Sequence, residues 1–329
     1  MPAGAGREKL IETVSQAGLR YAGGKGVNKI KRTGRRFLDP DKVFDLVNLL
    51  IMLVLLVIFV WPLWFVLIAS ISDPSQVWQG HVILFPKGIT LDAYEEVIKY
   101  KTIWTGYRNT IIYTVLGTAI NMVLTVCGAY PLSRKDFVPR KFFMIIFMIT
   151  MYFSGGLIPT YLVVNRLHLI DTVWAMVIPN AVSVFNIIIT RTYFINSIPD
   201  ELLEAAQLDG ANTAQYLFKV VLPLSKPILA VITLFYAVGH WNDFYSALIY
   251  INSQQLLPLQ SILRKLLLST QMTLQITSSM SPYEIMRKTQ LAQTLKYSSI
   301  IVSTVPVLCL YPLVQKHFVK GIMIGSVKG

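Results

Sequence analysis

The stretch ELLEAAQLDGANTAQYLFKVVLP, residues 201–223, is a short acid-bearing segment between two very hydrophobic runs. Its first part favours a helix, Gly210 breaks the helical pattern, and Leu222-Pro223 closes the segment before the next apolar run. Because glycine adopts backbone angles that other residues avoid, the pattern predicts two short helices joined by a turn at Gly210. Nothing in the stretch suggests a catalytic centre. It favours an exposed surface that another protein contacts.

The composition predicts an all-α polytopic membrane protein. A mean hydropathy of +0.54, with 54% hydrophobic and 14% charged residues, is too apolar for a soluble globular chain. Several runs exceed the roughly 20 apolar residues that cross about 30 Å of hydrocarbon. Six transmembrane helices are predicted, at residues 43–70, 108–132, 142–164, 172–194, 227–251 and 295–314.

The distribution of positive charge predicts the orientation in the membrane. Residues 1–42 carry ten Lys or Arg against four acids, and residues 133–141 carry four against one. Basic residues beside apolar spans mark the cytoplasmic side, so the net charge of +13 does not indicate a nucleic-acid partner. The N-terminal tail, the C-terminal tail (315–329) and the loop 195–226 are therefore expected to be cytoplasmic. The loop 252–294 is expected outside, and residues 43–314 are expected to form the membrane domain.

Two loops have a charge balance opposite to this rule. The loop 195–226 has four acids and two basic residues, whereas the loop 252–294 has four basic residues and one acid. The rule weakens in longer loops, and acids contribute little to it. No cleavable signal peptide is visible, so the first span should serve as its own insertion signal. Cys127 and Cys309 both fall in apolar spans and are expected to be free thiols.

The third predicted span is interrupted by residues 153–159, which read FSGGLIP. Two glycines and a proline within seven residues should bend or loosen a helix. Such a break is tolerated in a membrane where protein or a water-filled cavity satisfies the freed backbone groups. Close helix packing through small residues is an equally good interpretation.

The sequence has no recognisable catalytic or metal-binding motif. Its four histidines (His81, His168, His240 and His317) are widely separated, and no HExxH or paired-cysteine spacing occurs. The fragment GGKG at residues 23–26 lacks the spacing of a phosphate-binding loop. The chain is therefore expected to be no enzyme and to bind no ATP, magnesium or other cofactor itself. It is a secondary transporter, a channel, or the membrane part of a larger machine.

Residues 204–223 resemble the EAA motif (EAA-x3-G-x9-I-x-LP) of ATP-binding-cassette importer permeases. The spacing agrees throughout, with Val220 where isoleucine is usual. In that family the segment forms a coupling helix that docks on the ATPase subunit. The resemblance assigns this role to Glu204, Ala205, Ala206, Gly210, Leu222 and Pro223, with Leu202, Ala205 and Ala206 as the docking face. The alternative is a helix lying on the membrane surface, which acidic residues disfavour because they repel anionic lipid.

Segments outside the motif extend the resemblance to carbohydrate importers. They are YRNT at 107–110, AYPLSR at 129–134, Pro306, FVKG at 318–321 and GSVKG at 325–329. From about residue 43 the chain is similar to the second permease subunit of the maltose-type class, which has the type I importer fold. Residues 153–162 are most similar to the branch that serves larger oligosaccharides.

The resemblance implies a heteromeric importer in a bacterial cytoplasmic membrane. Its partners would be a second permease, two ATPase subunits that hold ATP and magnesium, and an extracellular solute-binding protein, often a lipoprotein in this branch. The loop 252–294 would face the binding protein, and Lys316, Lys320 and residues 325–329 would reach between the ATPase subunits. The alternatives are an importer permease for another solute and an ion-coupled secondary transporter. The latter needs a network of intramembrane acids, and Asp243 is the only deeply placed one.

Candidate residues for the substrate path lie about midway along the fifth predicted span. Polar groups at that depth usually face a cavity or a partner, and an aromatic ring beside hydrogen-bonding groups suits a sugar. The alternative is interhelical hydrogen bonding between two permeases, and in the maltose class the sugar contacts lie mainly on the other permease. The candidates are Trp241, Asn242 and Asp243, preceded by His240, with Asn121, Tyr152, Asn180 and Asn186 as weaker ones.

Overall fold

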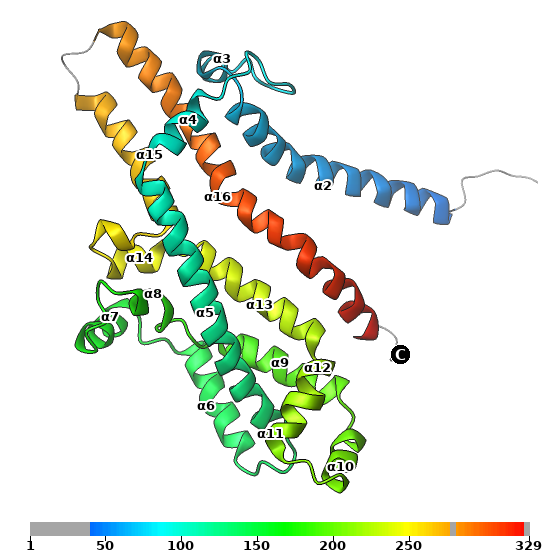
Figure 1. Ribbon diagram of the computed structural model, residues 1–329. Coiled ribbons are helices and arrows are strands. Elements are labelled where there is room, and N and C mark those ends of the chain that lie inside the picture. Colours follow the sequence, from blue (N-terminus) through cyan, green and yellow to red (C-terminus); the bar gives the residue numbers. More distant parts are fainter. Residues whose placement is uncertain (1–39, 277–280, 326–329) are drawn as a thin grey trace, which may run out of the picture. The chain divides into compact units, whose positions relative to one another are not determined.

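The computed structural model describes residues 40–276 and 281–325, and this part of the chain is helical with no β-strand (Figure 1). The predicted basic tail therefore lies almost wholly outside the described residues, as do residues 326–329 and the side chains of Lys316 and Lys320. The chain divides into two compact units, residues 1–59 and 60–329. Of the first unit, the structure describes only the N-terminal part of α2 (Pro40–Ser70).

The second unit contains the remaining helices, two of which are a π-helical and a 3-10 turn. In chain order they are α3 (Pro74–Trp78), α4 (Asp92–Lys99), α5 (Thr102–Ser133), α6 (Arg140–Tyr152), α7 (Leu157–Arg166), α8 (Val173–Val177), α9 (Val184–Ser197), α10 (Glu201–Leu208), α11 (Thr213–Tyr216), η1 (Leu217–Val221), α12 (Leu222–Leu224), α13 (Lys226–Trp241), α14 (Tyr245–Tyr250), η2 (Gln254–Leu256), α15 (Leu259–Ile276) and α16 (Pro282–Gly325).

Two helices in the described residues, α2 and α5, are each long and apolar enough to cross a membrane. Two bent pairs pass the same criteria if each pair counts as one span. They are α6 with α7, bent by 112°, and residues 213–224 with α13, bent by 81°. The interruption predicted at residues 153–159 is confirmed, because α6 ends at Tyr152 and α7 begins at Leu157. The count of six spans stays a prediction.

The fourth and fifth predicted spans are each broken, which the sequence analysis did not predict. Helices α8 and α9 are separated by residues 178–183, and α13 and α14 by residues 242–244. A polar side chain just before each second helix accepts a backbone N–H of its first turn. The Ser183 hydroxyl accepts the backbone N–H of Asn186 (3.4 Å), and the Asp243 carboxylate accepts that of Ser246 (3.0 Å). Such caps replace the hydrogen bonds that a helix start lacks.

The segment 252–294, expected as a loop outside the membrane, is largely helical in its described part, and its location stays a prediction. It contains η2, α15 and the first turns of α16, a helix of 44 residues that begins 13 residues before the predicted span. One face of α15 is buried, with Leu259, Ile262 and Leu263 exposed by 4% or less. Hydropathy misses these helices because their apolar residues are spaced along one face and alternate with polar ones.

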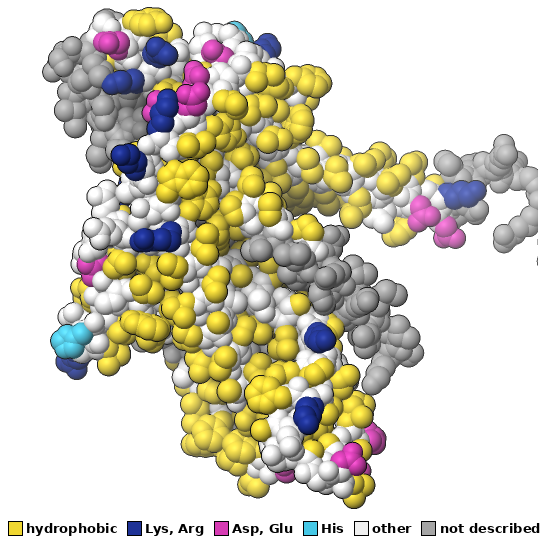
Figure 2. All heavy atoms as spheres, in the orientation of Figure 1, with side chains coloured by type: hydrophobic (Ala, Val, Ile, Leu, Met, Phe, Trp, Pro, Cys, Tyr) yellow, Lys and Arg dark blue, Asp and Glu magenta, His cyan; other side chains and the backbone are white. Residues whose placement is uncertain are grey.

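Helix α5 buries most of its uncharged polar side chains, whereas many of its apolar side chains are exposed. Asn109, Thr110, Asn121 and Thr125 are each 3% exposed or less, whereas Val115 is 65% exposed. Hydrophobic side chains also cover much of the visible face of the second unit (Figure 2). This arrangement suits a helix surrounded by lipid, where apolar residues need no burial and polar groups must find partners.

Buried side chains form two clusters along α5. The first joins its N-terminal half to α8, α14 and α15 and includes Tyr113, Met176 and Leu259. The second joins its C-terminal end to α9, α11 and η1 and includes Ile187 and Tyr216. The second cluster supports the residues that carry the EAA resemblance.

Candidate functional site

The motif residues form α10 and a tight turn after it. Gly210 has φ +73°, and its N–H donates to the carbonyl of Gln207 (3.0 Å). The N–H of Ala211 donates to the carbonyl of Ala206 (2.9 Å), which completes a Schellman motif. The EAA-x3-G spacing thus places Ala206, whose carbonyl accepts the Ala211 N–H, and Gly210, whose positive φ ends the helix, at their positions in this motif. A Cβ added to Gly210 would have no other atom within 4 Å, apart from its chain neighbours. Glycine is therefore required at this position by the backbone conformation and not by a lack of space.

The second half of the motif begins with a capping box. The Asn212 side chain accepts the N–H of Gln215 (2.8 Å), and the Gln215 side chain accepts the N–H of Asn212 (3.0 Å). The chain then passes through the π-helical turn η1 into α12, which contains Pro223. Leu222 is half-buried and Pro223 is exposed. The 81° bend before α13 follows this proline.

Helix α10 has one face against the protein and one face in the open. Leu203 and Ala206 pack against the second cluster, whereas Leu202 and Ala205 are exposed and Leu208 is 89% exposed. Of the three residues expected on the docking face, Leu202 and Ala205 are exposed, whereas Ala206 is half-buried against the second cluster; the docking role itself stays a prediction. The helical repeat places Ala205 and Ala206 about 100° apart, so the two alanines serve different surfaces.

The basic loop 133–141 lies against this motif. Lys135 forms an ion pair with Asp200, the residue that precedes α10. The guanidinium of Arg134 lies 5.8 Å from the centre of the Tyr216 ring. A cavity of about 470 Å³ lies between the loop and the motif. Arg134, Asp200 and Glu204 are among the residues that line it. The structure thus brings the most basic short loop and the acidic motif together.

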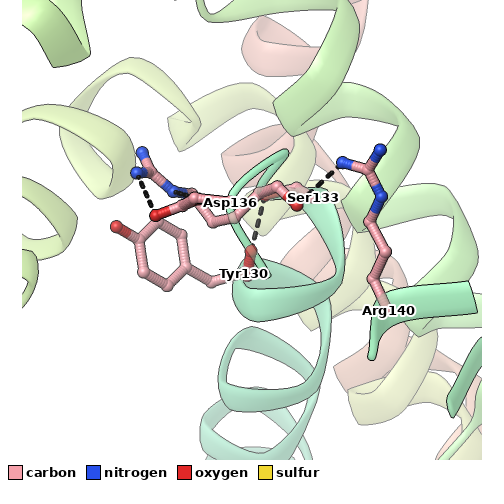
Figure 3. Close-up of polar contacts among 5 residues, drawn as sticks. Tyr130, Ser133, Asp136 and Arg140 are labelled. Atoms are coloured by element: carbon pink, nitrogen blue, oxygen red, sulfur yellow. Dashed lines mark hydrogen bonds and ion pairs between the residues drawn. The ribbon is translucent and has the colours of Figure 1, made fainter. Parts of the chain in front are cut away.

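Arg134 is held by a local network at the end of α5 (Figure 3). Its Nε and Nη2 each donate to the Asp136 carboxylate at 3.0 Å. Its carbonyl accepts Nη1 of Arg140 (3.0 Å), and Ser133 donates to the carbonyl of Tyr130 (2.6 Å). Hydrogen bonding to Arg134 lowers the pKa of the Asp136 carboxyl. The pair is therefore intact at neutral pH and is lost only as the pH falls through that lowered pKa.

Replacing Arg134 with alanine is expected to destabilise the purified protein by about 1–2 kcal/mol, since the contact with Tyr216 and the pair with Asp136 are both lost. The Arg134 side chain is only 15% exposed. The control is Lys135→Ala, because that side chain is 75% exposed and its ion pair should contribute at most about 1 kcal/mol. Thermal unfolding in detergent compares the two. Equal losses would contradict the role given to Arg134.

A second polar site lies between α5 and α13. Asn121 donates from Nδ2 to the carbonyl of Asn180 (2.9 Å), and its carboxamide oxygen accepts Nε2 of His240 (3.0 Å). These residues and Asp243 line a cavity of about 250 Å³. Tyr236 also lines it and is hydrogen-bonded through its hydroxyl to Thr125 (2.7 Å). Sequence analysis did not predict the Tyr236–Thr125 pair. Thr125 follows Asn121 by four residues, so their shared helix face could have indicated Thr125.

The other candidates for the substrate path lie elsewhere. Trp241 is 6% exposed and donates its indole N–H to the carbonyl of Ser303 (2.9 Å), so it is a packing residue. It ends α13 instead of lying in mid-span. Asn242 is exposed and bonded to Gln260 (3.3 Å). Tyr152 is 76% exposed at the end of α6 and is not among the residues that line the cavity.

Asn186 belongs to the interior and lines no described cavity. It is 6% exposed, and its carbonyl accepts the hydroxyl of Thr190 (2.8 Å). Among the described residues, no group of three or more His, Cys, Asp or Glu side chains is placed to hold a metal ion. The arrangement offers a docking surface and a polar cavity.

Residues 102–324 match the family model described as "Binding-protein-dependent transport system inner membrane component". The chain belongs to this family, which confirms the class of protein predicted from the sequence. Membership gives it the type I permease fold and a place in the inner membrane as part of an ABC transport system. In such systems a partner permease and a solute-binding protein complete the transporter, and a separate ATPase hydrolyses ATP.

Two curated relatives come from Bacillus subtilis (strain 168). The chain is 39% identical to "Protein LplC" over 291 residues, which is 88% of this chain and 96% of the relative. It is 40% identical to "Polygalacturonan/rhamnogalacturonan transport system permease protein YtcP" over 292 residues, 88% of this chain and 99% of the relative.

A solved structure is similar over nearly the same length. It is described as the crystal structure of a bacterial ABC transporter involved in the import of the acidic polysaccharide alginate. One of its chains superposes with a TM-score of 0.75 at 33% identity, covering 87% of this chain and all of that one.

Proposed function

We propose that this chain is one of the two permease subunits of an ATP-driven importer of carbohydrates, with oligosaccharides as the substrate. The class of transporter follows from the family. The carbohydrate is inferred from the transport systems after which YtcP and the alginate transporter are named, and both proteins match this chain over at least 87% of its length. The observation that carries the coupling role is the exposed outer face of α10, held at a defined angle by the Gly210 turn.

The proposed coupling runs from the ATPase through α10 into the membrane helices. The outer face, with Leu202, Ala205 and Leu208, would dock on the ATPase, and Glu204 would meet a basic group there. Leu203 and Ala206 pack on the same cluster as α5 and α9, so a force on α10 reaches both helices. Close packing transmits small displacements as rigid-body rotation, which suits a two-state transporter.

The proposed topology has six spans, with both termini and the motif in the cytoplasm. The ion pair of Lys135 with Asp200 supports placing the basic loop and α10 on one side of the membrane. Residues 1–42 and 315–329 would then be cytoplasmic tails, and residues 252–294 would face the binding protein. The polar cavity at Asn121, His240 and Asp243 is proposed as part of the substrate path.

Co-purification and a transport assay test this function. The chain, expressed with its native neighbours, should purify with a second permease and an ATPase. In vesicles with the solute-binding protein, members of a panel of neutral and acidic oligosaccharides should stimulate ATP hydrolysis and enter the vesicles. Transport by the purified chain alone, or stimulation only by other solutes, would refute the proposal.

Replacing Glu204 with lysine is expected to lower substrate-stimulated ATP hydrolysis at least tenfold, because the reversed charge repels a basic partner group and opposes the N-terminal helix dipole. Glu204 is exposed and has no ion pair within the described residues, so the fold should be unaffected. The control is Glu201→Lys, one turn earlier and equally exposed on the same helix. The coupling assignment fails if the Glu204 variant keeps normal stimulation.

A further inference from the structure

Helices α14 and α15 enclose a pocket of about 380 Å³ that the coupling mechanism does not use. Ser261, Arg264 and Lys265 line it from α15, and Phe244 lines it from the start of α14. Ser261 precedes Arg264 by three residues and Lys265 by four, so the three side chains share one face of the helix. The pocket thus combines two cations, a hydroxyl and an aromatic ring with an aliphatic wall, formed by Ala247, Leu248, Ile251, Leu257 and Leu268.

The pocket contains one buried hydroxyl without a hydrogen-bond partner and two cations that belong to no ion pair of the described residues. Ser261 is 8% exposed, and its hydroxyl has no hydrogen-bond partner. Arg264 and Lys265 are exposed, and neither belongs to one of the ion pairs of the described residues. A buried hydroxyl without a partner costs free energy that a bound ligand can recover. Two unpaired cations beside it favour an anionic ligand.

The position of Arg264 suits a carboxylate. Its guanidinium lies 5.2 Å from the centre of the Phe244 ring, which is 39% exposed. A guanidinium stacked on an aromatic face keeps its N–H edge free, and that edge matches a carboxylate with two parallel hydrogen bonds. Next to it, Asn242 and Gln260 are hydrogen-bonded to each other (3.3 Å) and add polar groups at the start of α15.

We propose that this pocket binds a carboxylate of an acidic oligosaccharide. The site lies at the predicted outer end of the fifth span, where a substrate enters from the binding protein. It gives a role to Arg264 and Lys265, which are two of the four basic residues in the segment 252–294. It agrees with the substrates after which YtcP and the alginate transporter are named, since polygalacturonan and alginate are acidic. It rests on the proposed function as a carbohydrate importer.

The test compares an acidic sugar with its uncharged counterpart. The complete transporter is reconstituted in phosphatidylcholine vesicles with its solute-binding protein, and import of trigalacturonate and of its methyl ester is measured. In the double variant Arg264→Gln and Lys265→Gln, import of trigalacturonate is expected to fall about tenfold, which corresponds to about 1.4 kcal/mol. Import of the ester should change less than about twofold, because its carbonyl groups gain little from a cation.

A matched control removes two charges elsewhere on the same predicted side. The variant Lys87→Gln and Lys101→Gln changes two exposed lysines outside the pocket and should import both sugars normally. Equal losses for acid and ester in the Arg264 and Lys265 variant would overturn the proposal, as would no loss. If losses for both sugars occur only when phosphatidylglycerol is present, the cations bind lipid phosphate and the proposal is also wrong.

Failure of this proposal is distinguishable from failure of the proposed function. A wild-type transporter that imports neutral oligosaccharides but not trigalacturonate overturns the carboxylate site and leaves the carbohydrate importer standing. A wild-type transporter that imports no oligosaccharide of the panel overturns the function itself.

Discussion

Replacing Gly210 with proline is expected to abolish ATP-driven import, at least a hundredfold, while the chain still inserts into the membrane. Gly210 has φ +73°, whereas proline holds φ near −65°. Proline also removes the N–H that donates to the Gln207 carbonyl. The turn between α10 and α11 cannot keep its geometry, so the outer face of α10 would no longer meet the ATPase at the required angle.

The measurement is uptake and stimulated ATP hydrolysis in vesicles, with assembly checked by co-purification of the second permease. Gly80 offers a matched control. It has φ +72°, its N–H donates to the Val77 carbonyl (3.1 Å), and a Cβ there would contact nothing within 4 Å. Gly80→Pro imposes the same backbone conflict away from α10, so import should persist. Normal coupling in the Gly210 variant would show that the turn is not part of the coupling element.

Replacing Gly117 with alanine is expected to destabilise the protein by several kcal/mol, because the added methyl group overlaps the His240 ring. A Cβ at Gly117 would lie 2.5 Å from Cε1 and 2.7 Å from Cδ2 of His240, which is 8% exposed. The imidazole must move, and its hydrogen bond to Asn121 is then lost. Overpacking costs about 1–3 kcal/mol and the hydrogen bond about 1 kcal/mol more.

Thermal unfolding of the detergent-purified protein measures this loss. The double variant Gly117→Ala with His240→Ala should recover most of the overpacking cost, because the clashing ring is gone. Gly239→Ala is the matched control, since a Cβ at this neighbour of His240 contacts nothing within 4 Å. Its effect on stability should be within about 1 kcal/mol of zero or stabilising. A Gly117 variant as stable as the Gly239 variant would contradict the packing described here.

Local sequence signals predicted the elements that depend on neighbouring residues. The break at 153–159 and the turn at Gly210 follow from glycine and proline, whose backbone preferences act within a few positions. Signals that depend on hydropathy were less successful. Hydropathy did not predict α15, whose buried apolar residues alternate with polar ones. It also predicted continuous spans at residues 178–183 and 242–244, where the helices are broken. After each break, a backbone N–H group donates to the side chain of Ser183 or Asp243, and hydropathy does not register such hydrogen bonds.

For the candidate site too, the sequence predicted some features and only the structure showed others. The motif spacing predicted α10, its turn and the class of transporter, but it assigned Ala206 to the docking face. Only the packed structure separates Ala205, which is exposed, from Ala206, which contacts the protein's own cluster. Among the substrate-path candidates, Asn121 and Asp243 line one cavity, whereas Trp241 is buried with its N–H already bonded. The position of a residue along a predicted span does not indicate whether its side chain is already hydrogen-bonded within the protein or lines a cavity.

By itself, the sequence determined that this is a helical membrane protein of the binding-protein-dependent importer family, and it supplied the proposal that residues 201–223 are the coupling element. Composition and motif spacing are sufficient for that, because both can be read along the chain. Only the tertiary structure decided which faces are inside, as for the buried polar side of α5 and the pocket at Arg264. The physical reason is that lipid and protein core are equally apolar, so hydropathy cannot tell a lipid-facing side chain from a buried one.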